Sequence, residues 1–193
     1  MMTVIVKGSA MPEDTRTSMI KSAARLFQER GYEGTSFQDV LARSGAPRGS
    51  IYHHFPGGKE ELAAEALRWY AQRTREELGR SENVAEAVAA FLAASRRAME
   101  KTGFVAGCPV AGVALDLADA GSPLHRVVAE SLSGWLRVLT RALEREGRTP
   151  DQARSLATFV IAAIEGALLL SRTERSAQPI DDVSEHLLAL LRL

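Results

Sequence analysis

The sequence predicts an all-α protein of about nine helices. Apolar residues recur at helical spacing through most of the 193 residues, and no segment of any length alternates as a β-strand would. Glycine and proline divide the chain into segments of helical length. With 46% hydrophobic and 25% charged residues, the composition is that of an ordinary globular protein, large enough for one large or two small domains.

The first long helix is expected at Glu13–Arg30, after a flexible arm formed by residues 1–12. Gly31 follows the helix directly, as a C-terminal capping glycine does. One apolar stripe at positions i, i+3, i+4 and i+7 is formed by Ile20, Ala23, Ala24 and Phe27. We expect this stripe to cover the next two helices, with a small shared core of Phe27, Phe37, Ile51 and Phe55.

Two short helices joined by a turn are predicted next. Ser36 and Asp39 have the spacing of a capping box, and Ser44-Gly45 ends the helix that they begin. The following helix, near Pro47–His53, buries Ile51. Its outward-facing residues are Arg48, Gly49, Ser50, Tyr52 and His53. This arrangement is typical of a helix-turn-helix that reads the major groove of DNA.

The distribution of charge supports a nucleic-acid partner, although the total charge does not. The chain carries 24 basic and 24 acidic residues, so its net charge gives no indication of a polyanionic partner. Between Val40 and Gly58, however, there is no acidic residue, and this segment contains Arg43, Arg48 and two histidines. A basic surface free of acid around a recognition helix is what phosphate contact requires.

These residues also carry a family resemblance. The ordered motifs are Thr35-Ser36, the turn at Gly45, Arg48-Gly49-Ser50, Ile51-Tyr52-x-His54-Phe55 and Lys59-Glu60-x-Leu62. Together they resemble the signature of TetR-family transcriptional repressors, densely over about residues 15–67. The segments GCPVAGVALDLA and IEGALLLSR further resemble the LmrA/YxaF-like subgroup of that family. The resemblance implies a DNA-binding domain at residues 13–60, and an effector-binding and dimerisation domain at residues 61–193.

Several DNA-contacting residues follow from this resemblance and from side-chain chemistry. Arg48 can donate two hydrogen bonds to guanine or pair with a phosphate, and Gly49 permits a close approach of the backbone. Thr35 and Lys59 lie at expected helix N-termini, where the helix dipole favours phosphate. The complete set expected at the DNA is Thr35, Ser36, Arg48, Gly49, Ser50, Tyr52, His53, His54 and Lys59.

No metal or cofactor is expected. Adjacent His53 and His54 point about 100° apart on a helix, whereas paired metal ligands need a spacing of three or four residues. The single cysteine, Cys108, excludes an intramolecular disulfide and a cysteine-based zinc site. It is interpreted as a packing residue, with a nucleophilic or redox role as the alternative, and no histidine lies near it in the sequence.

The remaining helices form the second domain. Gly57-Gly58 offers no side-chain acceptor at the start of the helix that connects the two domains, which departs from the family pattern. The expected helices are Gly58–Gly79, Ser81–Lys101, Val110–Ala118, Ser122–Glu146, Asp151–Arg172 and Asp181–Leu191.

Aromatic and sulfur-containing side chains of this domain can line a cavity for a small apolar or aromatic effector, and core packing is the alternative for each. The candidate effector-pocket residues are Phe91, Met99, Phe104, Cys108, Trp135 and Phe159.

The last two helices are expected to form a four-helix interface in a two-fold dimer, as the resemblance implies. The candidate interface residues are Phe159, Ala163, Glu165, Ala167, Leu187 and Leu191. Glu165 interrupts an apolar face, so its carboxylate needs a partner. That partner is either an arginine, in the core or across the dimer, or a ligand amine.

The expected function is a ligand-responsive repressor that binds a palindromic operator as a homodimer and is released by an effector. The alternatives are a constitutive DNA-binding dimer without an effector and a small helical enzyme that uses Cys108. No signal-peptide pattern and no run of 18 apolar residues is present, so we expect a cytoplasmic protein with no membrane partner.

Overall fold

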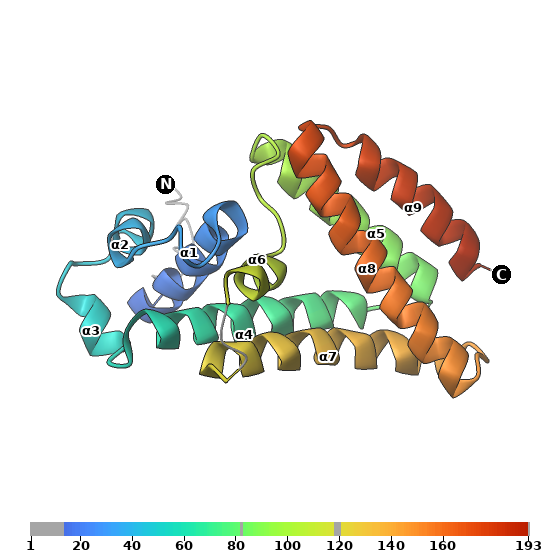
Figure 1. Cartoon of the computed structure of the whole chain (residues 1–193), viewed down its shortest axis with the longest axis horizontal. Coiled ribbons are helices and arrows are strands. Elements are labelled where there is room, and N and C mark those ends of the chain that lie inside the picture. Colours follow the sequence, from blue (N-terminus) through green and yellow to red (C-terminus); the bar gives the residue numbers. More distant parts are fainter. Residues whose placement is uncertain (1–13, 82, 118–120, 193) are drawn as a thin grey trace, which may run out of the picture.

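The computed structural model describes residues 14–81, 83–117 and 121–192, and within these ranges it is an all-α structure of nine helices (Figure 1). The predicted fold class is confirmed. The expected arm of residues 1–12 lies outside the described residues, as do Glu13 and the end of the helix predicted at Val110–Ala118. The helices are α1 (Thr15–Arg30), α2 (Phe37–Ser44), α3 (Ser50–His54), α4 (Gly58–Leu78), α5 (Val84–Lys101), α6 (Pro109–Asp116), α7 (Pro123–Arg145), α8 (Pro150–Glu174) and α9 (Gln178–Leu191).

Helix α2 begins and ends as its sequence predicts. The Ser36 hydroxyl accepts a hydrogen bond from the Asp39 amide at 3.2 Å, and the Asp39 carboxylate accepts one from the Ser36 amide at 2.8 Å. These two bonds make a complete capping box. Gly45 ends the helix with a φ of 70°, a left-handed conformation that glycine adopts without strain.

Helix α3 starts later than predicted. The sequence suggested a helix near Pro47–His53, whereas the observed α3 covers Ser50–His54 and Gly49 is its N-terminal capping residue. The Pro47 carbonyl accepts hydrogen bonds from the Ser50 amide at 3.0 Å and the Ser50 hydroxyl at 2.6 Å. Because these bonds close a turn, Arg48 and Gly49 lie in the turn before α3.

The first three helices share a small core with the start of α4. Phe27, Ile51 and Phe55 are buried, as predicted. Phe37 is only half-buried, and its ring meets Tyr52 edge-on at 5.6 Å between centroids. The cap that Gly57-Gly58 lacks is supplied from within α4, because the Glu61 carboxylate accepts a hydrogen bond from the Gly57 amide at 2.7 Å.

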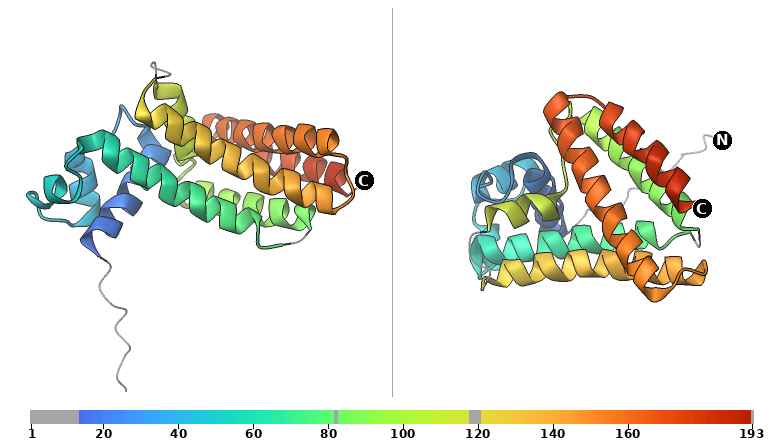
Figure 2. Two further views of the ribbon diagram at one scale, coloured as in Figure 1. Left: turned by 90° about the horizontal axis from the view of Figure 1, so that it is seen from below. Right: turned by 45° about the vertical axis from the view of Figure 1, so that its right-hand side comes forward.

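The rest of the chain forms a helical body extending from this head. Helix α4 leaves the head and runs alongside α7, while α5, α8 and α9 pack together on the other side (Figures 1 and 2). The Trp135 indole joins α7 to α4 by donating to the Ala71 carbonyl at 3.0 Å. The short helix α6 contacts α1 as well as α4 and α7, so it lies at the junction between head and body.

Candidate DNA-binding interface and effector cavity

The outer face of the head presents an unpaired guanidinium. Arg48 is exposed in the turn before α3 and makes no hydrogen bond or ion pair with any described residue. Tyr52 and His53, within α3, are also exposed, with 66% of the Tyr52 surface accessible. The side chain best suited to read a base edge is therefore free to do so.

A groove runs between α2 and α3 beside Arg48. Its volume is about 590 Å³, and Phe37, Gln38, Ile51 and Tyr52 contribute to its walls. Gln38 was not singled out from the sequence, although it is exposed and its amide can both donate to and accept from a base. Its position two residues after the Ser36 cap, on the first turn of the helix, is the signal that could have found it.

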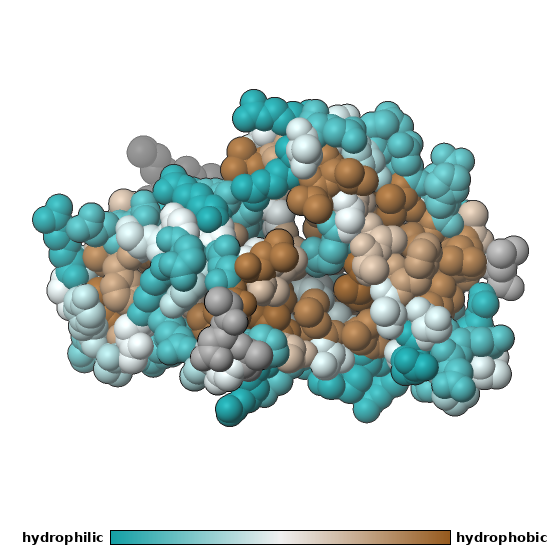
Figure 3. All heavy atoms as spheres, in the orientation of Figure 1, coloured by the Kyte–Doolittle hydropathy of each residue, from teal (hydrophilic) through white to brown (hydrophobic). Residues whose placement is uncertain are grey.

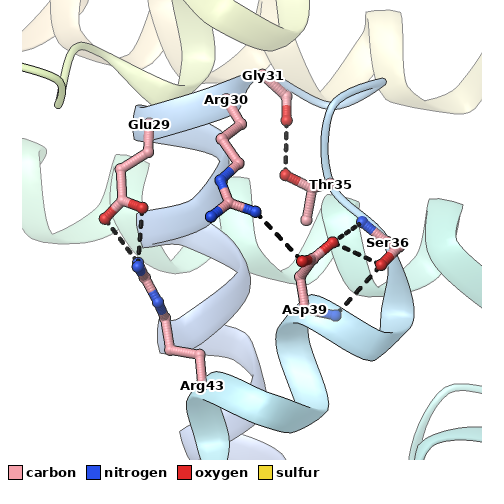
Figure 4. A network of polar contacts seen from close by, with 7 residues as sticks. All are labelled: Glu29, Arg30, Gly31, Thr35, Ser36, Asp39 and Arg43. Carbon is pink, nitrogen blue, oxygen red and sulfur yellow. Dashed lines mark hydrogen bonds and ion pairs between the residues drawn. The ribbon is translucent and has the colours of Figure 1, made fainter.

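The Thr35 side chain, expected near a phosphate, is turned into the head. Thr35 is only 2% exposed, and its hydroxyl donates to the Gly31 carbonyl at 2.8 Å (Figure 4). This bond ties the turn after α1 to the start of α2, so Thr35 has a structural role. The Ser36 hydroxyl takes part in the capping box, and the Ser50 hydroxyl is held by Pro47.

Lys59 and His54 are both half-buried at the edge of the head. The Lys59 ammonium lies 4.2 Å from the centre of the Tyr32 ring, a cation–π contact that positions the side chain at the start of α4. The His54 ring packs edge-on against His53 at 5.1 Å. Nowhere in the described ranges do three His, Cys, Asp or Glu side chains gather as metal ligands.

Acidic side chains from outside the Val40–Gly58 segment contact it in the folded protein. Arg43 makes two bonds to the Glu29 carboxylate of α1, at 2.7 and 2.8 Å, and Arg30 reaches Asp39 of α2 at 3.2 Å (Figure 4). Hydrogen bonds from Ser36, together with Arg30, lower the pKa of the Asp39 carboxyl. These pairs fix α2 on α1, so Arg43 contributes to the structure of the head and less to its net positive surface.

A cavity lies where the body meets α1 of the head. Its outer part, of about 330 Å³, lies among α1, α4, α5 and α8, and Trp69, Tyr70, Phe91 and Met99 provide its apolar walls. Three basic side chains also line it, Lys21 and Arg25 from α1 and Arg73 from α4. A second pocket, of about 10 Å³, adjoins the first and shares Tyr70, Thr74, Phe91 and Leu168 with it, and we name the two pockets the outer and inner parts of the cavity.

The expected pocket residues divide into two groups. Phe91 and Met99 line the outer part, and Phe91, Cys108 and Trp135 line the inner part. Phe159 does not line either part, because it projects from α8 with 54% of its surface exposed. Phe104 also lies outside both, in the turn after α5, where its φ of 63° is left-handed.

The half-buried Glu165 carboxyl and the buried Cys108 thiol both line the inner part of the cavity. Burial raises the pKa of the Glu165 carboxyl, and the neighbouring Cys108 thiol offsets part of that rise. Burial and the nearby Glu165 raise the pKa of the Cys108 thiol well above its usual value. No arginine pairs with Glu165 within the described part of one chain, which corrects the expected core ion pair. A thiol with a raised pKa is a poor nucleophile, so this geometry favours packing.

Comparison with known proteins accounts for both parts of the chain. Residues 19–66 match the family described as "Bacterial regulatory proteins, tetR family", and residues 84–186 match "Transcriptional regulator LmrA/YxaF-like, C-terminal domain". The HTH-type transcriptional regulator LmrA of Bacillus subtilis is 34% identical over 183 residues, covering 93% of this chain and 97% of LmrA. This chain belongs to the TetR family of transcriptional regulators.

Solved structures of TetR-family proteins share the fold. A TetR transcriptional regulator from Chloroflexus aurantiacus is 30% identical, with a TM-score of 0.75 over 93% of this chain and 95% of that one. CifR, solved as a cysteine mutant complexed with a 26-bp double-strand operator DNA, has a TM-score of 0.72 at 23% identity, over 95% of this chain and 98% of CifR. The predicted family and its LmrA/YxaF-like subgroup are confirmed, and this TetR-family chain is a DNA-binding transcriptional regulator.

Helix α8 carries exposed apolar side chains, but some of the expected interface residues are buried instead. Ala167, Leu187 and Leu191 are buried within one chain, where α9 packs against α5 and α8. Brown spheres gather over α8 and α9 in Figure 3, and the large exposed apolar side chains there are Phe159, Leu169, Leu170 and Leu190. The exposed apolar face of α8 therefore includes Phe159 but excludes Ala167, which was also expected at the interface.

The sequence could not separate the two faces of α8, because this helix is apolar on nearly all sides. By length and composition alone it could cross a membrane. One such helix is weak evidence for a membrane span. Exposed apolar side chains that gather on one face of a protein mark an interaction surface.

Proposed function

We propose that this TetR-family protein is a homodimeric repressor that binds a near-palindromic operator and is released from it by a small apolar or aromatic effector. The proposal rests on Arg48, which is exposed beside Tyr52 and His53 and has no ion pair with any described residue. Arg30 and Arg43 of the same head are instead bound to carboxylates. A free guanidinium next to a recognition helix is suited to guanine or phosphate.

The proposed DNA contacts divide by chemistry. Arg48 reads a base edge, and Gln38, Tyr52 and His53 add hydrogen-bonding groups on the same face. Lys59 contacts a phosphate at the N-terminal end of α4, where the helix dipole assists. Further contacts to the DNA backbone are assigned to Ser36, Gly49, Ser50 and His54, each through whichever backbone or side-chain groups remain free.

The dimer forms through the exposed side of α8 and the adjacent end of α9. Phe159 and Leu170 would lie at its centre, with Ala163 and Gly166 allowing the helices to approach closely. A two-fold axis through such a four-helix interface places two heads on one side of the dimer. Heads that enter successive major grooves lie about 34–36 Å apart, which matches a near-palindromic operator.

The effector site is the cavity among α1, α4, α5 and α8. Its aromatic walls suit an apolar or aromatic ligand, and Glu165 offers one polar group at the inner end. For release, the ligand must bind the conformation that does not bind DNA more tightly, by a few kcal/mol for an effective switch. We propose that residues 13–60 bind DNA and that residues 61–193 bind the effector and form the dimer.

The proposal includes no catalytic step and no cofactor, and it places the protein in the cytoplasm, where its operator would be. A constitutive DNA-binding dimer is the second candidate, favoured by the small volume of the inner cavity, about 10 Å³. The 330 Å³ outer part favours the ligand-responsive regulator, because it is of the size that small-molecule sites have.

The test is a selection of duplexes from a random library by the full-length protein, with the mass of the free and DNA-bound protein measured in solution. We expect enrichment of a near-palindrome bound by an even number of chains. Binding without sequence preference, or by a single chain at every concentration, would refute the proposal.

A further inference from the structure

An arginine of the body binds the C-terminal end of α1. Arg172 of α8 donates hydrogen bonds to the Gln28 carbonyl at 3.1 Å and to the Glu29 carbonyl at 2.8 Å. The last carbonyls of a helix lack partners within the helix and carry the negative end of its dipole. The Gly107 amide, in the segment before α6, donates to the same Gln28 carbonyl at 2.9 Å. A guanidinium and a backbone amide thus replace the partners that the helix end lacks.

A carboxylate at the end of α6 binds the turn that follows α1. Asp116, the last residue of α6, accepts hydrogen bonds from the Tyr32 amide at 2.7 Å and the Glu33 amide at 3.1 Å. Gly31 has a φ of 73°, and a Cβ atom there would lie 2.6 Å from the Asp116 carboxylate. The turn therefore needs glycine both for its conformation and for the approach of α6. We name the Arg172, Asp116 and Gly107 contacts the α1 clamp.

The residues that the clamp holds continue directly into the helix-turn-helix. Glu29, whose carbonyl binds Arg172, has its carboxylate on Arg43 of α2 (Figure 4). The Gly31 carbonyl accepts from Thr35, one residue before the capping box of α2. A displacement of the end of α1 therefore shifts α2 with it, because bonds on both sides of the turn join the two helices.

The other side of the clamp continues into the cavity. Arg172 lies seven residues after Glu165 on α8, about two turns along the same face. Between them, Leu168 lines both parts of the cavity. Gly107 lines the outer part, and the adjacent Cys108 lines the inner part beside Glu165. Arg172 and Gly107 thus each lie on a segment that a ligand would touch.

We propose that Arg172 and Asp116 are positioning residues that fix the orientation of the DNA-binding head, and that occupation of the cavity turns the head by moving the α1 clamp. This inference rests on the proposed function, since it specifies how the effector site regulates DNA binding. Neither side chain needs to touch DNA or ligand. A mutation in the clamp therefore changes how well two heads fit a fixed operator, while phosphate contacts stay the same.

The experiment uses the full-length protein and the duplex that the wild type selects. Arg172→Ala is compared with Arg154→Ala, which removes an exposed arginine on the same helix whose nearest acid, Asp151, lies 3.8 Å away at the surface. We expect Arg172→Ala to weaken operator binding roughly 3- to 30-fold, the range found for residues that carry coupling. We also expect a broader tolerance of half-site spacing and an unchanged salt dependence, because no phosphate contact is lost. Arg154→Ala should match the wild type.

A second variant guards against a folding defect. Asp116→Ala should broaden the spacing tolerance in the same way and accelerate hydrogen exchange at the Tyr32 and Glu33 amides, with the melting of the body helices retained. Identical spacing profiles for Arg172→Ala, Asp116→Ala and Arg154→Ala would overturn the positioning role. If the wild type selects no duplex, the proposed function fails; if it selects one and the clamp variants bind it normally, only the clamp fails.

The link to the cavity is tested without an identified ligand. Ser95 lines the outer part, so Ser95→Trp would fill it and imitate occupancy. We expect Ser95→Trp to weaken operator binding in the wild-type background and to have a much smaller effect in the Arg172→Ala background, because both changes act through one contact. Additive effects of the two substitutions, or wild-type affinity for Ser95→Trp, would contradict the link.

Discussion

The head and the body of this TetR-family regulator are stabilised by different means. In the head, a core of few large side chains is supplemented by capping bonds and ion pairs between α1 and α2, so little apolar surface needs to be buried. In the body, long helices bury an extended core, yet they leave a cavity inside and apolar side chains on α8 outside. The difference indicates that the head presents one fixed surface, whereas the body keeps apolar surface for a ligand and for a second chain.

The largest expected effect is on the small core of the head. Phe27→Ala should reduce the free energy of unfolding by about 3–5 kcal/mol, because Phe27 is 2% exposed and few neighbours can fill the space. Chemical denaturation of the full-length protein measures this loss. Phe159→Ala is the matched control on the body, where the exposed ring should contribute less than about 1 kcal/mol to the stability of a single chain. Equal losses for the two variants would contradict the contrast.

The next effect concerns the outer face of the body. Phe159→Glu should weaken dimerisation by at least about 2 kcal/mol, the loss typical of an interface hot spot, because it buries an unpaired charge twice in a symmetric dimer. Sedimentation equilibrium in the analytical ultracentrifuge measures the dissociation constant of the dimer. Arg154→Glu is the control, because it places a carboxylate at an exposed position near the start of the same helix. A dimer as stable with Phe159→Glu as with Arg154→Glu would place the interface elsewhere.

Arg48 provides the corresponding test on the head. Arg48→Ala should weaken binding to the selected duplex by roughly 1–3 kcal/mol and relax the preference for one base pair in each half-site. Fluorescence anisotropy with single-base variants of the duplex measures both quantities. Arg43→Ala should instead lower stability, since that arginine is bound to Glu29. An Arg48→Ala protein with the wild-type pattern of base preference would remove the proposed reading role.

The smallest expected effect is the pH dependence that comes from Glu165. Burial raises the pKa of this carboxyl, so between its unfolded and folded pKa values the folded chain binds more protons than the unfolded chain. Stability therefore falls as pH rises from the unfolded pKa through the folded pKa. Glu165→Gln should remove this fall, which amounts to roughly 1.4 kcal/mol for each pH unit that separates the two pKa values. Parallel pH–stability curves for the wild type and Glu165→Gln would show that the carboxyl is solvated.

The sequence predicted local features of the head well and long-range ones poorly. The capping box of Ser36 and Asp39 lies within one helical turn, so its chemistry is visible in the sequence. The pairing of Arg43 with Glu29 and the contact of Arg172 with Gln28 join residues 14 and 144 positions apart, and no pattern in one sequence reports them. The burial of Thr35 could not be predicted for the same reason, because it depends on how α1 and α2 pack together.

In the body, the sequence predicted the helices but not which faces they bury. Helix α8 is apolar on nearly all sides, so periodicity could not assign Ala167 to the core and Phe159 to the exposed face. Among the candidate pocket residues, Phe91, Cys108 and Trp135 line the inner part of the cavity. Phe104 does not, because the turn after α5 directs it elsewhere.

Sequence-specific binding of DNA by the head is tested by a single ratio of dissociation constants. The dissociation constant of the full-length protein is measured for the selected duplex and for a scrambled duplex of equal length and composition, at the same salt concentration. We expect a ratio of at least about 10³, as specific regulators show. Equal affinities for the two duplexes would contradict sequence-specific binding.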